Sequence, residues 1–379
     1  MSFRDHFNQL KNKAEELNRK HNILPIGQNK PQQQAYSHQY YPGQYQPQPG
    51  QWPPPPQPQG QPWQQQQHQY QQPPPPPPNY STRPGGPPAI PSHSRPAEPA
   101  PAYPSPHGPT VYWRPNFSPE IPVSHEFEQK QGHGEPWGWG NNELENYTAS
   151  PANSFHTADG KLVVRAIAQQ AHPDAEARYT SARLVSRATL GRAEGCLTAW
   201  LTLPCAEGVW PAFWLLPREP FVWPHEGEVD VAETWNGDRQ NHACLHWGFY
   251  TPDDAAKHLV RTTHVPDMPH RPVRFDFAWR CAGTPRRPED GKSAGGGRLM
   301  WYVDGRPVMK NLMPPGTRPI EDWVVLLNVA MGGNVCQGKV PQDGAYDLVV
   351  HGLQMSDAVD GGWGRFDHDW QHCVDGAVM

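Results

Sequence analysis

Proline is distributed so unevenly along this chain that only part of it can pack into a globular domain. The 379 residues include 49 prolines, which crowd into the N-terminal third. From about residue 31 to residue 109 the sequence is mainly Gln, Pro, Gly and Tyr, with too little apolar surface to offset the entropy lost on folding. We therefore predict a disordered Pro/Gln-rich region over residues 23–109 and one globular domain over residues 110–379.

Two short features of the N-terminal third could serve in binding. Pro77-Pro78-Asn79-Tyr80 ends a polyproline stretch and resembles the Pro-Pro-x-Tyr ligand of WW domains, although a plain spacer is the favoured interpretation. Residues 1–22 are predicted to form a short amphipathic helix, because five apolar side chains recur at alternating spacings of four and three. A weakly helical, solvated terminus is an equal alternative. The five are Phe3, Phe7, Leu10, Ala14 and Leu17.

Charge, cysteine spacing and hydropathy exclude several classes of protein. A formal net charge of −5 gives no basic footprint for nucleic acid. The cysteines form no C-x-x-C pair and no zinc spacing with histidines, so buried free thiols and no metal site are expected. No signal-like or membrane-spanning apolar run is present, which predicts a cytoplasmic or unconventionally secreted protein. A monomer is also expected. The cysteines are Cys196, Cys205, Cys244, Cys281, Cys336 and Cys373.

From Val111 onward the sequence changes to short β-rich runs separated by Gly, Pro, Asn and Asp, which predicts an antiparallel sandwich or barrel without long helices. Val303-Asp304-Gly305-Arg306 is predicted to form a tight hairpin turn, and Cys281 to Gly297 a surface insertion between two strands. The predicted strands are Leu162–Ala168, Cys196–Leu203, Ala243–Tyr250, Val273–Trp279, Leu299–Val303 and Trp323–Ala330.

The segment from Gly227 to Gly237 carries three acidic residues on one predicted strand. Alternation places Glu228 and Asp230 on one face, and an extra residue at Ala232, forming a β-bulge, would return Glu233 to that face. Two glutamates across such a bulge can converge to about 5–5.5 Å, the spacing of a retaining glycosidase. Crowded carboxylates raise one another's pKa, so one of them can act as a general acid.

An acidic edge strand that merely discourages aggregation is the competing interpretation of these carboxylates. Large aromatic rings near the acids in the sequence argue against it, because a solvated face rarely carries so many. Flat aromatic faces also stack against sugar rings, although any single ring could instead fill the core. A carbohydrate cleft is therefore favoured. The rings are Trp210, Phe213, Trp214, Trp223, Trp235 and Trp247.

The run Glu228 to Glu233 matches the Glu-x-Asp-x-x-Glu signature of family 16 glycoside hydrolases, and further blocks follow the family's order from about Val111 to Ala358. The chain thus resembles laminarinases, endo-β-1,3-glucanases, of a fungal type. The other matching blocks are Asn141–Thr148, Tyr179–Arg183, Trp210–Pro217, His246–Gly248, Trp301–Gly305 and Leu326–Gly333.

This resemblance implies a concanavalin A-like jelly-roll sandwich with a glucan cleft. By matching position, Glu228 would be the nucleophile, Asp230 its helper and Glu233 the acid/base. The bulged signature implies β-1,3-glucan as substrate. The implied substrate-binding residues are Trp210, Trp214, Trp235, His246 and Asn142. His246 could instead be structural, and Asn142 could cap a turn.

One block departs from the family pattern: Gly195–Trp200 lacks two basic positions, which would alter a sugar contact. No cofactor is expected, because the two-carboxylate mechanism needs none. Two other functions use the same features. A transglycosylase would resolve the glycosyl-enzyme with a sugar hydroxyl in place of water, and a non-catalytic glucan-binding module would keep the sandwich without turnover.

Overall fold

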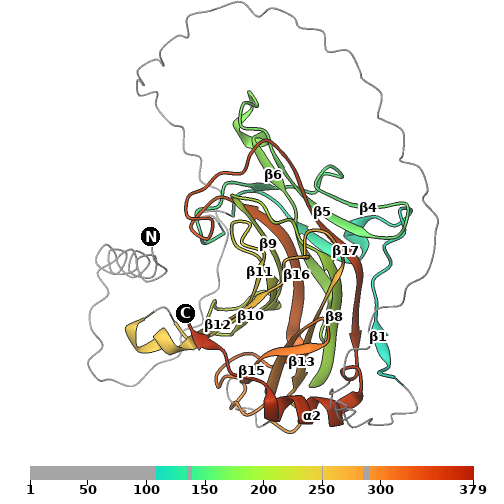
Figure 1. Cartoon of the computed structure of the whole chain (residues 1–379), viewed down its shortest axis with the longest axis vertical. Coiled ribbons are helices and arrows are strands. Elements are labelled where there is room, and N and C mark those ends of the chain that lie inside the picture. The colour runs from blue at the N-terminus through green and yellow to red at the C-terminus, as the bar shows by residue number, and fades with distance from the viewer. Residues whose placement is uncertain (1–107, 135–138, 250, 285–290) are drawn as a thin grey trace, which may run out of the picture. The chain divides into compact units, whose positions relative to one another are not determined.

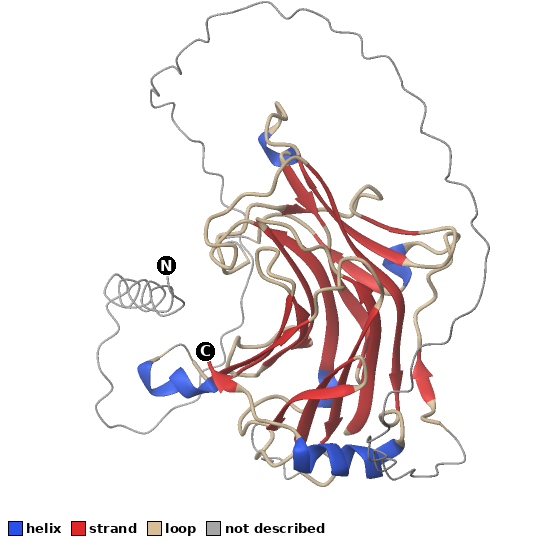
Figure 2. Ribbon diagram, viewed as in Figure 1, coloured by secondary structure: helices blue, strands red, loops and turns tan. Residues whose placement is uncertain are grey.

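The computed structural model describes residues 108–379 apart from 135–138, 250 and 285–290. This part of the chain is a two-layer β-sandwich, which confirms the predicted fold class (Figures 1 and 2). The predicted N-terminal helix, the Pro/Gln-rich region up to residue 107 and the Pro77–Tyr80 motif lie outside the described residues. Within the described residues, no helix has the length and apolar character needed to cross a bilayer.

A ten-stranded sheet forms one layer, in the order β15-β14-β13-β8-β17-β5-β6-β3, with β1 beside β17 and β4 beside β5. Its pairs are antiparallel except for β3 with β6. The strands are β1 (Val111–Trp113), β3 (Asn146–Tyr147), β4 (Ser154–His156), β5 (Leu162–Ala168), β6 (Tyr179–Ser181), β8 (Glu194–Thr202), β13 (Val273–Arg280), β14 (Arg298–Val303), β15 (Arg306–Leu312) and β17 (Gly344–Ser356).

An eight-stranded antiparallel sheet forms the other layer, in the order β18-β12-β11-β10-β9-β16-β7-β2. The strands are β2 (Phe127–Lys130), β7 (Arg183–Thr189), β9 (Val209–Pro217), β10 (Glu228–Glu233), β11 (Gln240–His246), β12 (His258–His264), β16 (Trp323–Met331) and β18 (Ala377–Val378). Short 3-10 turns η1 (Val123–His125), η2 (Ala175–Ala177), η3 (Pro252–Lys257) and η4 (Ile320–Asp322) connect some of them.

Alternating side chains from both sheets fill the space between the layers. On β9, Phe213 and Leu215 enter this core, whereas Trp214 and Leu216 contribute to a smaller apolar cluster on the outer face of the eight-stranded sheet. Phe213 therefore belongs to the core and Trp247 packs against it, so neither ring lines the acidic site as the sequence suggested.

The predicted hairpin is confirmed at β14–β15, where Asp304 and Gly305 have φ of 47° and 73°. Positive φ at both central residues is the requirement of a type I′ turn. The strand predicted over Ala243–Tyr250 instead spans Gln240–His246. The Cys281–Gly297 segment separates β13 from β14, as expected for an insertion.

Helix α2 (Gly362–His372) was not predicted, and it lies beside β13 and β15 at one end of the sandwich (Figure 1). Its apolar stripe is short. Phe366, which is fully buried, packs with Trp363 and Trp370 over Cys196 and Tyr302 of the ten-stranded sheet. An 11-residue helix with three large apolar residues gives too weak a period to be detected in the sequence.

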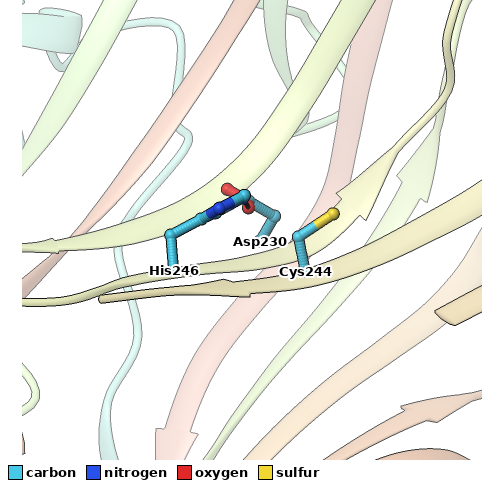
Figure 3. A group of neighbouring side chains, drawn as sticks. All are labelled: Asp230, Cys244 and His246. Atoms are coloured by element: carbon cyan, nitrogen blue, oxygen red, sulfur yellow. Dashed lines mark ion pairs between the residues drawn. The ribbon is translucent and has the colours of Figure 1, made fainter. Parts of the chain in front are cut away.

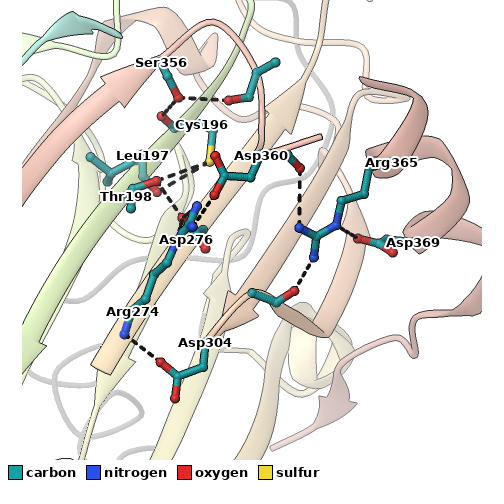
Figure 4. A network of polar contacts seen from close by, with 12 residues as sticks. Cys196, Leu197, Thr198, Arg274, Asp276, Asp304, Ser356, Asp360, Arg365 and Asp369 are labelled. Atoms are coloured by element: carbon teal, nitrogen blue, oxygen red, sulfur yellow. Dashed lines mark hydrogen bonds and ion pairs between the residues drawn. The ribbon is translucent and has the colours of Figure 1, made fainter. Parts of the chain in front are cut away.

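This helix also explains the departure at Gly195–Trp200. That block lies on β8 of the ten-stranded sheet, so the expected effect on a sugar contact is wrong. Cys196 is buried beneath α2, and Thr198 Oγ1 donates to buried Asp276 at 2.6 Å. Arg274 pairs with Asp276 at 2.9 Å and also with Asp360, just before the helix (Figure 4).

We expect Phe366→Ala to lower the free energy of unfolding by about 3–5 kcal/mol, because it empties a fully buried ring site beneath α2. Urea unfolding followed by circular dichroism would measure the change. Gln371→Ala, on the exposed face of the same helix, is the matched control and should shift stability by no more than about 0.5 kcal/mol. Equal unfolding curves for the two variants would contradict the packing role of α2.

Candidate active site

The acidic strand β10 contains the predicted bulge, displaced by one residue. Against β9, Asp230 pairs with Trp214 and Ala232 with Phe213, so Val231 is the extra residue and the predicted position, Ala232, is wrong. Val231 and Ala232 both enter the core, because two adjacent residues of the bulge share one opposing position. The bulge thereby returns Glu233 to the face that carries Asp230.

Two buried side chains satisfy the backbone groups that the bulge leaves without ladder partners. The Asn241 amide of β11 donates to Val231 O at 3.3 Å, and its oxygen accepts from Glu233 N at 3.2 Å. Trp301 reaches across the core from β14 and donates Nε1–H to Asp230 O at 2.9 Å. Both sheets therefore fix the shape of the acidic strand. Asn241 could not be identified from the sequence, because its partners lie eight and ten residues earlier in the chain.

Glu228 opens the acidic strand opposite His246 of β11. Burial and the nearby Asp230 carboxylate raise its pKa to about 7, while His246, Trp223 and Arg183 favour its ionised form. The Trp223 indole, itself 48% exposed, donates a short hydrogen bond to Glu228 Oε2. A half-exposed ring therefore adjoins a carboxylate that can ionise near neutral pH.

Asp230 is 3% exposed and lies 3.4 Å from His246 Nε2. Asp230 and Glu228 raise the pKa of His246 against the effect of its burial. The other ring nitrogen of His246 contacts His258 Nδ1 at 3.0 Å, and burial together with His246 lowers the pKa of His258 to about 4. His246 thus donates to both Asp230 and a neutral His258. The sequence did not identify His258.

Glu233 is 5% exposed and accepts hydrogen bonds from two indoles, Trp210 Nε1 at 2.8 Å and Trp235 Nε1 at 3.1 Å. Burial and repulsion from Asp230 and Glu228 nevertheless raise its pKa well above the usual range. Trp235 stacks on His242 with centroids 3.7 Å apart. Trp210 and Trp235, two of the three tryptophans assigned to substrate binding from the sequence, thus hydrogen-bond to the Glu233 carboxylate.

The Cys244 thiol is buried close to the acidic strand and is affected by the charges of all three carboxylates. Cys244 lies opposite Asp230 in the β10–β11 ladder and is 1% exposed. Burial and then Asp230, Glu233 and Glu228 raise the pKa of its thiol well above the usual range. All three acids therefore act on one point of the sheet, as the bulge predicts.

Arg183 of β7 is a cleft residue that the sequence placed only within a matching block. Its guanidinium lies between two indoles, 4.5 Å from the Trp139 ring centroid and 4.7 Å from that of Trp214. Trp214 in turn donates Nε1–H to Asn328 Oδ1 at 2.7 Å, and Asn328 donates to Tyr147. These contacts hold Trp214, one of the predicted platforms, at a fixed orientation.

A cavity of about 400 Å³ extends along the same face beyond Trp214. Apolar side chains of β7, β9 and β16 form part of its lining, and Arg183 and Trp139 also line it. The lining includes Val185, Leu216, Phe221, Val324, Leu326, Lys130, Arg187 and Arg218. A groove of this mixed apolar and polar character suits a ring-shaped polar ligand with hydrophobic faces.

The side-chain contact of Asn142 is with Asn334, not with the acidic residues or tryptophans of β10 and its neighbouring strands. It has φ of 57°, is exposed, and donates from Nδ2 to Asn334 Oδ1 at 3.1 Å. This is the turn role that the sequence left open. A glucan contact of Asn142 stays a prediction.

One group of possible metal ligands lies at the acidic strand. One ligand atom each of Asp230, Cys244 and His246 lie within 4.8 Å of one another, and all three residues are buried (Figure 3). Sequence spacing could not reveal them, because they come from two paired strands. The chemistry of two glutamates with raised pKa values beside a sugar-sized groove needs no metal.

Comparisons with known proteins agree with this geometry. Residues 144–264 match the family described as "XgeA-like, catalytic GH16 domain". A "Glucan endo-1,3-beta-glucosidase" of Cryptopygus antarcticus is 37% identical over 218 residues, which cover 53% of this chain and 74% of that protein. The "Clotting factor G alpha subunit" of Tachypleus tridentatus is 28% identical over 231 residues, 59% of this chain, but the match spans only 30% of that subunit.

Solved structures share the fold. The laminarinase from Rhodothermus marinus has a TM-score of 0.53 and 25% identity, covering 67% of this chain and 99% of that one. The endo-β-1,3-glucanase from Pyrococcus furiosus has a TM-score of 0.50 and 26% identity, covering 66% and 95%. The two-layer sandwich is therefore an architecture shared with these proteins.

Proposed function

This chain belongs to glycoside hydrolase family 16, and on that basis we propose that it is a retaining endo-β-1,3-glucanase. The observation that carries the proposal is the bulged strand β10, whose register shift returns Glu233 to the face that carries Glu228 and Asp230. A relative 37% identical bears the name of a β-1,3-glucan hydrolase. The fungal type of the resemblance stays a prediction.

The order of the two glutamate pKa values supports the assignment of roles. A double-displacement mechanism needs one ionised carboxylate to attack the anomeric carbon and one protonated carboxyl to donate to the departing oxygen. Glu228, with a pKa of about 7, is the more acidic of the two and serves as nucleophile. Glu233, with a pKa well above its usual range, keeps its proton and serves as general acid.

In the second step the same two groups exchange tasks. Glu233, now ionised, removes a proton from a water molecule, which attacks the glycosyl carbon and releases Glu228. Asp230 raises the pKa of both glutamates through its charge, and His246 Nε2, 3.4 Å away, orients the Asp230 carboxylate. The two indoles on Glu233 favour its ionised form and so assist this second step.

The substrate would lie along the outer face of the eight-stranded sheet. Trp210 borders Glu233, and Trp214, Arg183 and Trp139 lead from β10 into the 400 Å³ cavity. Indole faces stack on pyranose rings, and the Arg183 guanidinium offers hydrogen-bond donors to sugar hydroxyls. We also expect the domain to act as a monomer, and the Pro77–Tyr80 motif to be a plain spacer, with a WW-domain ligand as the alternative.

Purified protein incubated with laminarin should release reducing ends, with the β-anomer as the first product in NMR spectra. Retention follows from two successive inversions at the anomeric carbon. β-1,6-Glucan is the control polysaccharide and should remain intact. An α-anomer as first product would contradict the nucleophile role of Glu228, and products longer than the substrate would indicate transglycosylation. Glucan binding without any cleavage would leave only the binding-module alternative.

A further inference from the structure

We infer that Asp230, Cys244 and His246 form an inhibitory site for Zn²⁺ at the catalytic strand. One carboxylate oxygen, the thiol sulfur and one ring nitrogen lie within 4.8 Å of one another. Asp230 of β10 lies directly opposite Cys244 of β11, and His246 follows two residues later on the same strand. Figure 3 shows the three side chains on one side of these adjacent strands.

The geometry is close to what zinc requires. Ligand atoms of a tetrahedral zinc site with one sulfur lie about 3.3–3.8 Å apart, given the usual metal–ligand distances. Asp230 Oδ2 and His246 Nε2 are already 3.4 Å apart. Only the thiol needs to approach, and Cys244 Sγ makes just a weak contact of 3.9 Å with His242 O, so a small movement loses little.

The environment favours a cation that prefers sulfur and nitrogen ligands. The three residues are 3%, 1% and 8% exposed, and Glu228 and Glu233 add further acidic groups around the thiol. Thiolate and imidazole select Zn²⁺, Co²⁺ or Cd²⁺ over Mg²⁺ and Ca²⁺. Binding would displace the thiol proton of Cys244 and the Nε2 proton of His246, and both protons pass to the buffer.

The effect on activity rests on the proposed function. A bound Zn²⁺ would occupy the oxygen of Asp230 and the nitrogen of His246 that now face each other. Asp230 and His246 would then be held by the metal and could no longer contact each other beside Glu228. The mechanism itself does not use the Cys244 thiol, so the thiol can be removed without removing a reacting group.

Binding of Co²⁺ tests the site without any need for catalysis. Wild-type protein titrated with Co²⁺ should develop the thiolate-to-cobalt charge-transfer absorption. Cys244→Ala should lack this band, whereas Cys196→Ala, which changes an equally buried thiol beneath α2, should retain it. Cys244→Ser provides a second, nearly isosteric variant that should also lack the band. A band of wild-type intensity in both Cys244 variants, or no band in wild type, would overturn the site.

Inhibition of laminarin hydrolysis tests the consequence. Zn²⁺ should inhibit wild type and Cys196→Ala, and Mg²⁺ at the same concentration should not. Cys244→Ala should keep the basal rate and need more than about tenfold higher Zn²⁺, since even outer-shell changes cost about 10–100-fold in metal affinity. Equal inhibition of all three proteins would refute the proposed site. A cobalt band in a protein inactive on laminarin would refute the glucanase proposal and leave the metal site standing.

Discussion

Glu228→Gln is expected to reduce kcat on laminarin by about four orders of magnitude, because the amide cannot form the covalent glycosyl intermediate. Glutamine has the shape of glutamate and retains an oxygen that can accept the Trp223 hydrogen bond, so the fold should be unchanged. Reducing-end assays would measure the loss, and circular dichroism would check the fold.

A matched control for this variant lies just before β9. Glu207→Gln changes an exposed glutamate that pairs loosely with Lys339 at 3.5 Å, away from the acidic strand. It should retain wild-type kcat and KM. Full activity in Glu228→Gln, or an equal loss in both variants, would remove Glu228 from the role of nucleophile.

Glu233→Gln should lower kcat by about 10²–10⁴-fold, because the departing sugar oxygen loses its proton donor. Wild-type activity should fall as pH drops through about 7, where Glu228 becomes protonated, and fall again at a higher pH, where Glu233 ionises. Replacing Glu233 should abolish the alkaline limb and keep the acidic one. The pH dependence of kcat/KM measures both limbs.

A donor with an activated leaving group separates this role from a structural one. Such a group departs without protonation, so Glu233→Gln should form the glycosyl-enzyme from a laminaribiosyl fluoride at a rate close to wild type. If the variant is as slow on the fluoride as on laminarin, Glu233 is not the general acid.

The sequence predicted the features whose signals are local. Period-two alternation identified the central strands, and the Asp304-Gly305 pair identified the β14–β15 turn, because side chains within a few residues determine both. The acidic strand itself was recognised because three carboxylates with this spacing lie within six residues. The bulge was assigned to Ala232 in place of Val231, since either position restores the same face for Glu233.

Features that depend on contacts between distant segments could not be predicted. Asn241 and Trp301 secure the bulge from another strand and from the other sheet. Arg183 comes to lie between two tryptophans more than 30 residues away on either side in the sequence. His258 contacts His246, which in turn lies against Asp230. None of these contacts leaves a periodic or regularly spaced pattern in the sequence, because each depends on how the strands pair and pack.

Residues 373–379 connect helix α2 to His258, which contacts His246. After α2, Val374 O accepts from Lys310 N of β15, and Ala377–Val378 then extends the other sheet as β18 beside β12. Met379 N donates to His258 O at 2.9 Å. Residues 373–379 thus link the two sheets, because they bond to β15 in one layer and pair with β12 in the other, next to His258, which contacts His246. A substitution that separated these two layers would therefore also displace His258 and, through it, His246.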